Sequence, residues 1–169
     1  AGYGKTTLVL QALDDAGSNR VIAWYSIDER DNDPARFVAY LVGTLHRSLS
    51  TPDRVALTTV PLGDGSLEAD LEHILNLVAQ SERHIVLVID DYHRISNPII
   101  HGLMDYLIEF MPFGLRLVIV ARFDPPLPLA RWRSRGELTE FRIGDLSFTV
   151  SEIADYLAFD AGDRVHFVS

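Results

Sequence analysis

The sequence has 169 residues, 47% of them hydrophobic and 23% charged, which excludes a disordered chain and is enough for one domain with a buried core. Its formal net charge of −9 at pH 7 argues against nucleic-acid binding by this segment, because phosphate backbones would repel it. The absence of cysteine excludes disulfides and cysteine-ligated zinc, and the longest apolar runs are far too short to span a membrane.

The first predicted elements are a helix, a strand and a second helix. Residues 5–16 predict a helix, and 21–28 (VIAWYSID) predict a buried strand, because β-branched and aromatic residues dominate that stretch. The second helix begins at Asp33 and Pro34. An aspartate before a helix accepts hydrogen bonds from first-turn amides, and a proline in the first turn lacks an amide that would have no partner there.

The middle of the chain repeats this alternation. Prolines and glycines make 51–65 a predicted loop, and the spacing of apolar residues makes 66–80 a predicted helix. The runs HIVLVIDD at 84–91 and LRLVIVAR at 115–122 are continuously apolar, which is typical of strands buried on both faces of a parallel sheet. Asn97, followed by proline, starts a helix between them.

The last predicted elements are short. DPPLPLA at 124–130 predicts a proline-rich turn, RWRSRG at 131–136 a solvated turn, 137–143 a strand and 149–157 a helix. Strands that alternate with helices indicate βαβ units. We therefore expect an α/β fold with a parallel sheet that is covered on both faces.

The opening stretch AGYGKTT, at 1–7, contains the last three positions of the phosphate-loop pattern GxxxxGK[ST]. Gly4, Lys5 and Thr6 occupy these positions, and the first glycine of the pattern would precede residue 1. Small residues let backbone amides wrap the β- and γ-phosphates, while the lysine neutralises phosphate charge and the threonine hydroxyl ligates Mg²⁺. The alternative interpretation is a glycine-rich terminus that binds nothing.

A pair of acids, Asp90 and Asp91, ends the apolar run that starts at residue 84. Open α/β sheets bind ligands at the carboxyl ends of their strands, so this pair has the form of a Walker B element. The first acid would hold Mg²⁺ through water, and the second would orient an attacking water. The alternative is an ordinary strand-to-turn junction, and the GKT loop earlier in the chain favours the first interpretation.

Arg122 ends the next apolar run and would point at the same crevice, where it could sense a γ-phosphate. The alternative is a surface arginine that pairs with Asp124. His93 follows the two acids, and a structural histidine is favoured there over one that contacts phosphate.

Four stretches together resemble the ATPase domain of large LuxR-type transcriptional regulators of the maltose-activator kind: AGYGKTTL, DERDNDPARFVAYL, VLVIDDYHRISNP and LVIVARFDPPLPLARWRSRGEL. These regulators belong to the STAND class of P-loop ATPases. The resemblance runs from residue 1 to about 157, and it implies a P-loop NTPase three-layer sandwich with a parallel sheet. It also implies a P-loop ATPase core at 1–145 and the start of a following helical domain at 146–169.

The resemblance implies a cytoplasmic molecular switch with ATP and Mg²⁺ as cofactors, in which slow hydrolysis resets the active state. Its implied partners are ATP or ADP, promoter DNA bound through a C-terminal module, a small-molecule inducer bound by helical repeats, and further copies of the protein on activation, with no membrane. By position in the family's motifs, the nucleotide-binding residues are Gly2, Tyr3, Gly4, Lys5, Thr6 and Thr7, the Mg²⁺ ligands are Thr6 and Asp90, and the catalytic residues are Asp91 and Arg122.

The chain departs from the family pattern at both ends. By the family pattern, the first, central strand of the sheet is expected to be missing from the chain, which would leave 86–89 and 118–120 short of a neighbour, so we expect low stability and weak ATP binding. The tail FDAGDRVHFVS, at 159–169, does not match the family. Two other functions stay open: a P-loop kinase or metabolic NTPase that turns over at about 1–100 per second, and a degenerate scaffold that binds no nucleotide.

Overall fold

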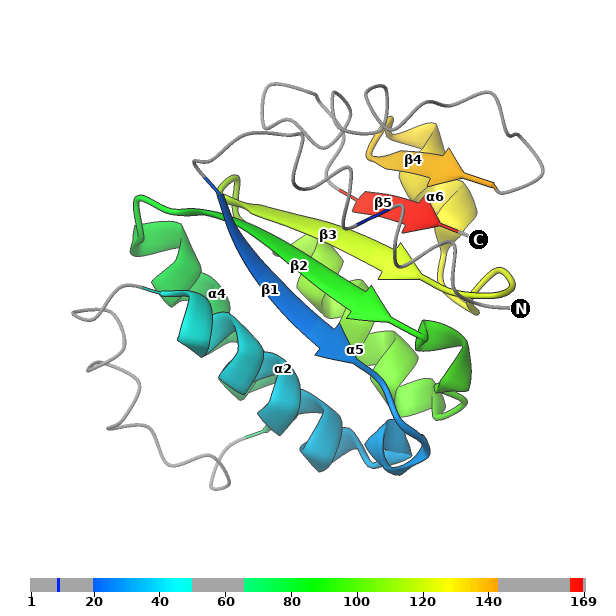
Figure 1. The fold of residues 1–169 in the computed structure, drawn as a ribbon, viewed down its shortest axis with the longest axis horizontal. Coiled ribbons are helices and arrows are strands. Elements are labelled where there is room, and N and C mark those ends of the chain that lie inside the picture. The colour runs from blue at the N-terminus through cyan, green and yellow to red at the C-terminus, as the bar shows by residue number, and fades with distance from the viewer. Residues whose placement is uncertain (1–8, 10–19, 50–65, 143–164, 169) are drawn as a thin grey trace.

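The structure is a computed structural model that describes residues 9, 20–49, 66–142 and 165–168. These residues form an α/β fold around one five-stranded sheet, in which every pair of neighbouring strands is parallel (Figure 1). The strand order is β1-β2-β3-β5-β4. The strands are β1 Arg20–Ser26, β2 His84–Asp90, β3 Leu115–Val120, β4 Leu138–Phe141 and β5 Val165–Val168. The predicted α/β fold with a parallel sheet is confirmed, whereas its P-loop type stays a prediction.

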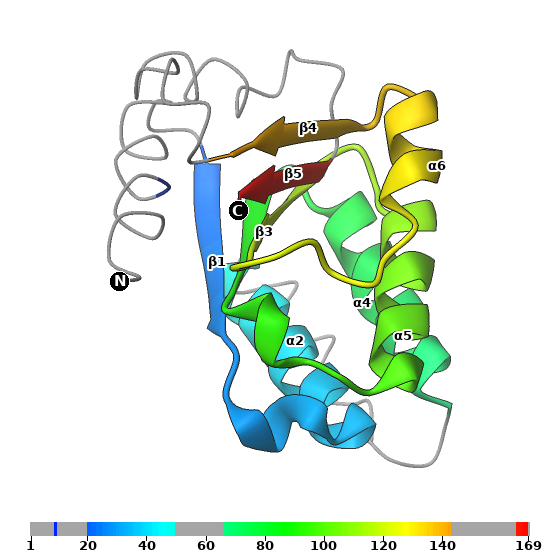
Figure 2. The same cartoon turned by 90° about the vertical axis from the view of Figure 1, so that its right-hand side faces the viewer.

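The described helices lie on one side of the sheet, which Figure 2 shows nearly edge-on. They are α2 Pro34–Ser48, α4 Leu67–Gln80, α5 Pro98–Glu109 and α6 Leu129–Ser134, with the short 3-10 helices η1 Glu29–Asn32 and η2 Tyr92–Arg94. The side chains of Asp33, Ser66 and Asn97 cap α2, α4 and α5 by accepting a hydrogen bond from a first-turn amide. Within the described ranges, no helix has the length and apolar character needed to cross a bilayer.

The main core lies between the sheet and these helices. On β2, Ile85, Leu87 and Ile89 belong to this core and are fully buried. The alternate residues Val86 and Val88 are equally buried, so β2 is covered on both faces. Burial on both faces explains why the sequence of this strand is continuously apolar and does not alternate.

β5 lies between β3 and β4, although it comes last in the sequence (Figure 1). His166 pairs with Val118 of β3 on one side and with Thr139 of β4 on the other. Just beyond the ladder, the amide of Ala121 donates to the carbonyl of Val168 at 3.0 Å. All of β5 is buried. This strand therefore satisfies backbone groups of β3 that would otherwise be buried without a partner.

The position of β5 changes two expectations. We expected 86–89 and 118–120 to lack a neighbour, which is wrong: β2 pairs with β1 and β3, and β3 pairs with β2 and β5. We also assigned all of 146–169 to a following helical domain, but 165–168 belongs to the same sheet as β1 to β4. The predicted helix at 149–157 lies outside the described residues.

Most other predicted elements in the described ranges are confirmed. The strands and helices expected at 21–28, 34–49, 66–80, 84–91 and 115–122 match β1, α2, α4, β2 and β3 to within a few residues. The helix expected after Asn97 and the strand expected at 137–143 match α5 and β4. Residues 129–134 form α6 where we expected turns, and the fully buried Trp132 anchors this helix. The predicted loop at 51–65 and most of the predicted helix at 5–16 lie outside the described residues, although Val9 is helical and buried.

The first prediction tests β5. Phe167 is fully buried in the core, so Phe167→Ala should lower the free energy of unfolding by about 3–5 kcal/mol through lost contacts and a cavity. Equilibrium unfolding in urea, followed by circular dichroism, measures this change.

The matched control is Phe113→Ala, because Phe113 is 78% exposed and should contribute less than about 0.5 kcal/mol. Equal effects of the two substitutions would mean that β5 does not pack in the sheet.

Candidate functional site

The strands β1, β2, β3 and β5 end at the same edge of the sheet, because they are parallel (Figure 1). Ser26, the last residue of β1, pairs with Asp90, the last residue of β2. The amide of Ile27 donates to the carbonyl of Asp90 at 3.0 Å, which extends this pairing by one residue. The loops after these strands therefore begin side by side, and we call this side of the molecule the carboxyl edge.

Asp90 stands at the carboxyl edge and is half-buried. Its Oδ1 accepts a hydrogen bond of 2.9 Å from the amide of Asp91, so the carboxylate is held over the end of β2. Mg²⁺ in nucleotide sites is commonly bound by one or two protein oxygens together with phosphate oxygens and water. A single fixed carboxylate at this position fits that requirement.

Asp91 adopts the left-handed backbone conformation, with φ 59° and ψ 31°. Among the described residues, it is the one residue other than glycine with a positive φ. Aspartate tolerates this conformation better than most residues, because its short side chain can bond locally. Asp91 Oδ2 lies 3.4 Å from Arg94 Nε, and Oδ1 lies 3.7 Å from His93 Nδ1. Arg94 thus orients the carboxylate that we predicted to orient water.

Arg122 follows β3 at the same edge and is exposed. In the described part of the chain, no acidic side chain lies within ion-pair distance of it. The predicted alternative, a pair with Asp124, is not formed, because Asp124 accepts a hydrogen bond of 3.0 Å from Arg142 instead. A cation without an acidic neighbour among these residues fits the role of a phosphate sensor.

Two aromatic contacts support the loop that carries the acids. The ring of His93 packs edge-on against Phe123 at 5.7 Å, which joins the loops after β2 and β3 and fits the structural interpretation of His93. Tyr92 is buried, and its hydroxyl lies 2.8 Å from His101 Nδ1 of α5. Burial raises the pKa of Tyr92 above its ordinary value and lowers the pKa of His101.

The segment after β1 contributes polar groups to which the sequence analysis gave no role. Asp31 is buried, and its carboxylate accepts hydrogen bonds from Arg36 Nε at 2.8 Å and from the amide of Asp28 at 2.9 Å. Burial, and then the Asp31 carboxylate, raise the pKa of Tyr25. The side chain of Asn32 spans from this segment to the loop after Asp91. In the sequence, only the polar run DND at 31–33 marks these groups, and it does not show which residues they bind.

The structure thus brings Asp90, Asp91 and Arg122 together at one edge. The other predicted site residues, Gly2, Tyr3, Gly4, Lys5, Thr6 and Thr7, lie outside the described residues. Within the described residues, there is no group of three or more acidic or histidine side chains that could hold a metal ion alone. A Mg²⁺ ion at Asp90 would therefore need further oxygen ligands, from a hydroxyl group, phosphate or water.

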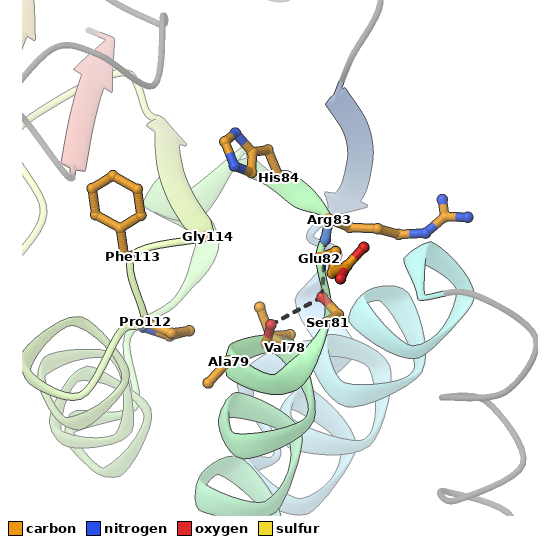
Figure 3. Close-up of a pocket in the computed structure, with 9 residues that line it drawn as sticks. All are labelled: Val78, Ala79, Ser81, Glu82, Arg83, His84, Pro112, Phe113 and Gly114. Carbon is orange, nitrogen blue, oxygen red and sulfur yellow. Dashed lines mark hydrogen bonds between the residues drawn. The ribbon is translucent and has the colours of Figure 1, made fainter.

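A cavity of about 260 Å³ opens at the opposite edge of the sheet (Figure 3). It is lined by the end of α4, where Ser81 Oγ donates to the carbonyl of Val78 at 2.9 Å, and by His84, Phe113 and Gly114 at the amino ends of β2 and β3. Because ligands of open parallel sheets bind at carboxyl ends, this cavity is distinct from the candidate site.

No protein-family model matches the chain. A parallel α/β sheet supports many unrelated activities, so the fold alone assigns no function.

The second prediction concerns His101. Burial disfavours its charged form, so its folded pKa lies below the ordinary value of about 6.5. The contribution of this group to stability is complete above pH ~6.5 and is lost as the pH falls through the folded pKa. His101→Gln should therefore lose less stability than the unmodified chain between about pH 7.5 and pH 5.

Urea unfolding of both proteins at the two pH values measures this difference. Every other titrating group is common to the two proteins. If both proteins lose the same stability on acidification, burial does not lower the pKa of His101 in the folded chain.

Proposed function

We propose that this chain is the ATP-binding switch module of a signal-responsive, LuxR-type transcriptional regulator, in which slow ATP hydrolysis resets the active state. The observation that carries this proposal is the placement of Asp90, Asp91 and Arg122 at the carboxyl edge of adjacent parallel strands. Two acids and a cation at this edge match what a magnesium–triphosphate ligand needs.

Lys5 adds an independent argument from the sequence. It is the only lysine in the 169-residue sequence, and all the other residues in the Lys and Arg total are arginines. It follows Gly4 and precedes Thr6, as the phosphate-loop pattern requires. A lysine suits this place because its compact ammonium group can reach between phosphate oxygens.

Each residue has one proposed task. Gly2, Tyr3, Gly4 and Thr7 would offer backbone amides to the phosphates, and Lys5 would neutralise their charge. Thr6 and Asp90 would hold Mg²⁺, which supplies positive charge next to the phosphates when it is bound. Asp91, oriented by Arg94, would accept a hydrogen bond from water, and Arg122 would contact the γ-phosphate.

The kinase alternative receives less support. A phosphoryl acceptor would have to bind beside the γ-phosphate, at the carboxyl edge. No stretch of the sequence resembles a lid that would bind such an acceptor. The scaffold alternative does not explain why Lys5, Thr6, Asp90 and Asp91 are all present in the pattern of a nucleotide site.

The remaining partners belong to the parent regulator. Promoter DNA would bind a separate C-terminal module, because the net charge of −9 makes this chain unsuited to DNA. The small-molecule inducer would bind helical repeats, and activation would assemble several copies. These partners rest on the resemblance of the sequence stretches and not on the described residues.

The third prediction tests the phosphate loop. Lys5→Ala should weaken Mg²⁺–ATP binding by at least about tenfold, because a charge-assisted contact to phosphate is lost. A fluorescent ATP analogue titrated against the protein gives the dissociation constant.

Arg135→Ala is the matched control, because it also removes one positive charge but from an exposed residue that pairs with Glu109 at 2.9 Å. If Lys5→Ala binds ATP as tightly as this control, the phosphate-loop assignment is wrong.

The fourth prediction tests the metal site. Asp90→Asn should remove most of the gain in ATP affinity that Mg²⁺ provides, because the amide is a poorer Mg²⁺ ligand than the carboxylate. Affinity measured in excess chelator should not fall, because the substitution removes a negative charge that repels the phosphates. Titrations with and without MgCl₂ measure both values.

The matched control is Glu72→Gln, an exposed residue of α4 whose substitution changes the charge by the same amount. A full magnesium effect in Asp90→Asn would exclude Asp90 as a metal-binding residue.

A further inference from the structure

The side-chain amide of Asn32 joins two loops of the carboxyl edge. Its Oδ1 accepts hydrogen bonds from the amide of Ser96 at 2.7 Å, from Ser96 Oγ at 3.2 Å and from the amide of Asn97 at 3.3 Å. Its Nδ2 donates to the carbonyl of Arg94 at 2.8 Å and to that of Glu29 at 3.3 Å. The donors and the acceptor of this amide are thus all used.

A second bond runs in the opposite direction. Asn97 Nδ2 donates to the backbone carbonyl of Asn32 at 3.0 Å, while Asn97 Oδ1 caps α5. The next residue after Asn32 is Asp33, which caps α2. The contact therefore holds together the starts of two helices and the loops that precede them.

This contact holds the backbone of Arg94. The carbonyl of Arg94 is bound by Asn32, its amide donates to the carbonyl of Asp91 at 3.0 Å, and its Nε lies 3.4 Å from the Asp91 carboxylate. Asp91 itself has the left-handed backbone conformation, which is costly unless its surroundings hold it. Without the side chain of Asn32, the carbonyl of Arg94 and the amide of Ser96 would lose this partner in the turn after β1.

We propose that Asn32 is a positioning residue for ATP hydrolysis: it holds Arg94, and through Arg94 it sets the carboxylate of Asp91 at the γ-phosphate. This inference rests on the proposed function. Asn32 touches neither nucleotide nor water in this role, so its loss should affect turnover more than affinity.

Asn32→Ala provides the test in the full chain. Turnover of Mg²⁺–ATP should fall about 10- to 100-fold, since a misplacement of about 1 Å in a catalytic group costs on that order. The dissociation constant of the fluorescent ATP analogue should stay within about threefold, because the proposed phosphate contacts come from the amino-terminal loop. Phosphate release and fluorescence titration measure the two quantities.

Asn32→Asp tests the donor and acceptor roles of the amide separately. It keeps the acceptor for Ser96 and Asn97, but it loses the donor to the carbonyls of Arg94 and Glu29. Its turnover should lie between those of the unmodified chain and Asn32→Ala. Asn76→Ala, at an exposed position of α4, should leave turnover and affinity unchanged.

The outcomes distinguish the two proposals. If the unmodified chain binds and hydrolyses ATP and Asn32→Ala does so equally well, the role of Asn32 is wrong and the proposed function stands. If Asn32→Ala and Asn32→Asp lose affinity in proportion to turnover, Asn32 is structural and this inference is overturned. If the unmodified chain binds no nucleotide, both proposals fall.

Discussion

The pairing of β5 between β3 and β4 is the constraint on which the other features depend. Strands buried on both faces have no water to satisfy their backbone groups, so each needs a partner on each side. β5 gives β3 its second partner and links β4 to the sheet. It also fixes the backbone where β3 ends, because the carbonyl of Val168 accepts a hydrogen bond from the amide of Ala121, the residue before Arg122.

Polar side chains at the carboxyl edge hold the loops that follow β1 and β2. Asp31 holds the turn after β1 through Asp28 and Arg36, and Asn32 ties this turn to the loop after β2. Because the residues that cap α2 and α5 adjoin the same contacts, a shift of the acidic loop would be felt at the first turns of both helices. In the proposed switch, these contacts are a route by which a ligand at the carboxyl edge would act on both helices.

Local signals explain most of what the sequence could predict. Asp33 and Asn97, each followed by proline, mark helix starts through contacts within one turn, and β2 and β3 are recognisable because burial on both faces makes them wholly apolar. β5 was missed because it has four residues and takes its stability from distant partners. The acids were placed by their position after β2. Asn32 could not be assigned, since the groups it binds in the second loop lie 62 to 65 residues away.

The acidic neighbours of each arginine determine whether its charge is available to bind a nucleotide. The basic cluster of α6 is neutralised by its own neighbours, because Arg131 pairs with Asp105, Arg133 with Glu140 and Arg135 with Glu109. Arg122 has no such acid among the described residues, and it stands at the edge where Asp90 and Asp91 place two negative charges. A triphosphate brought there would be repelled by these acids unless Mg²⁺ lay between them and the phosphates. We therefore expect the proposed site to bind nucleotide much more tightly with its metal than without it, with Lys5 and Arg122 as the proposed sources of the remaining positive charge.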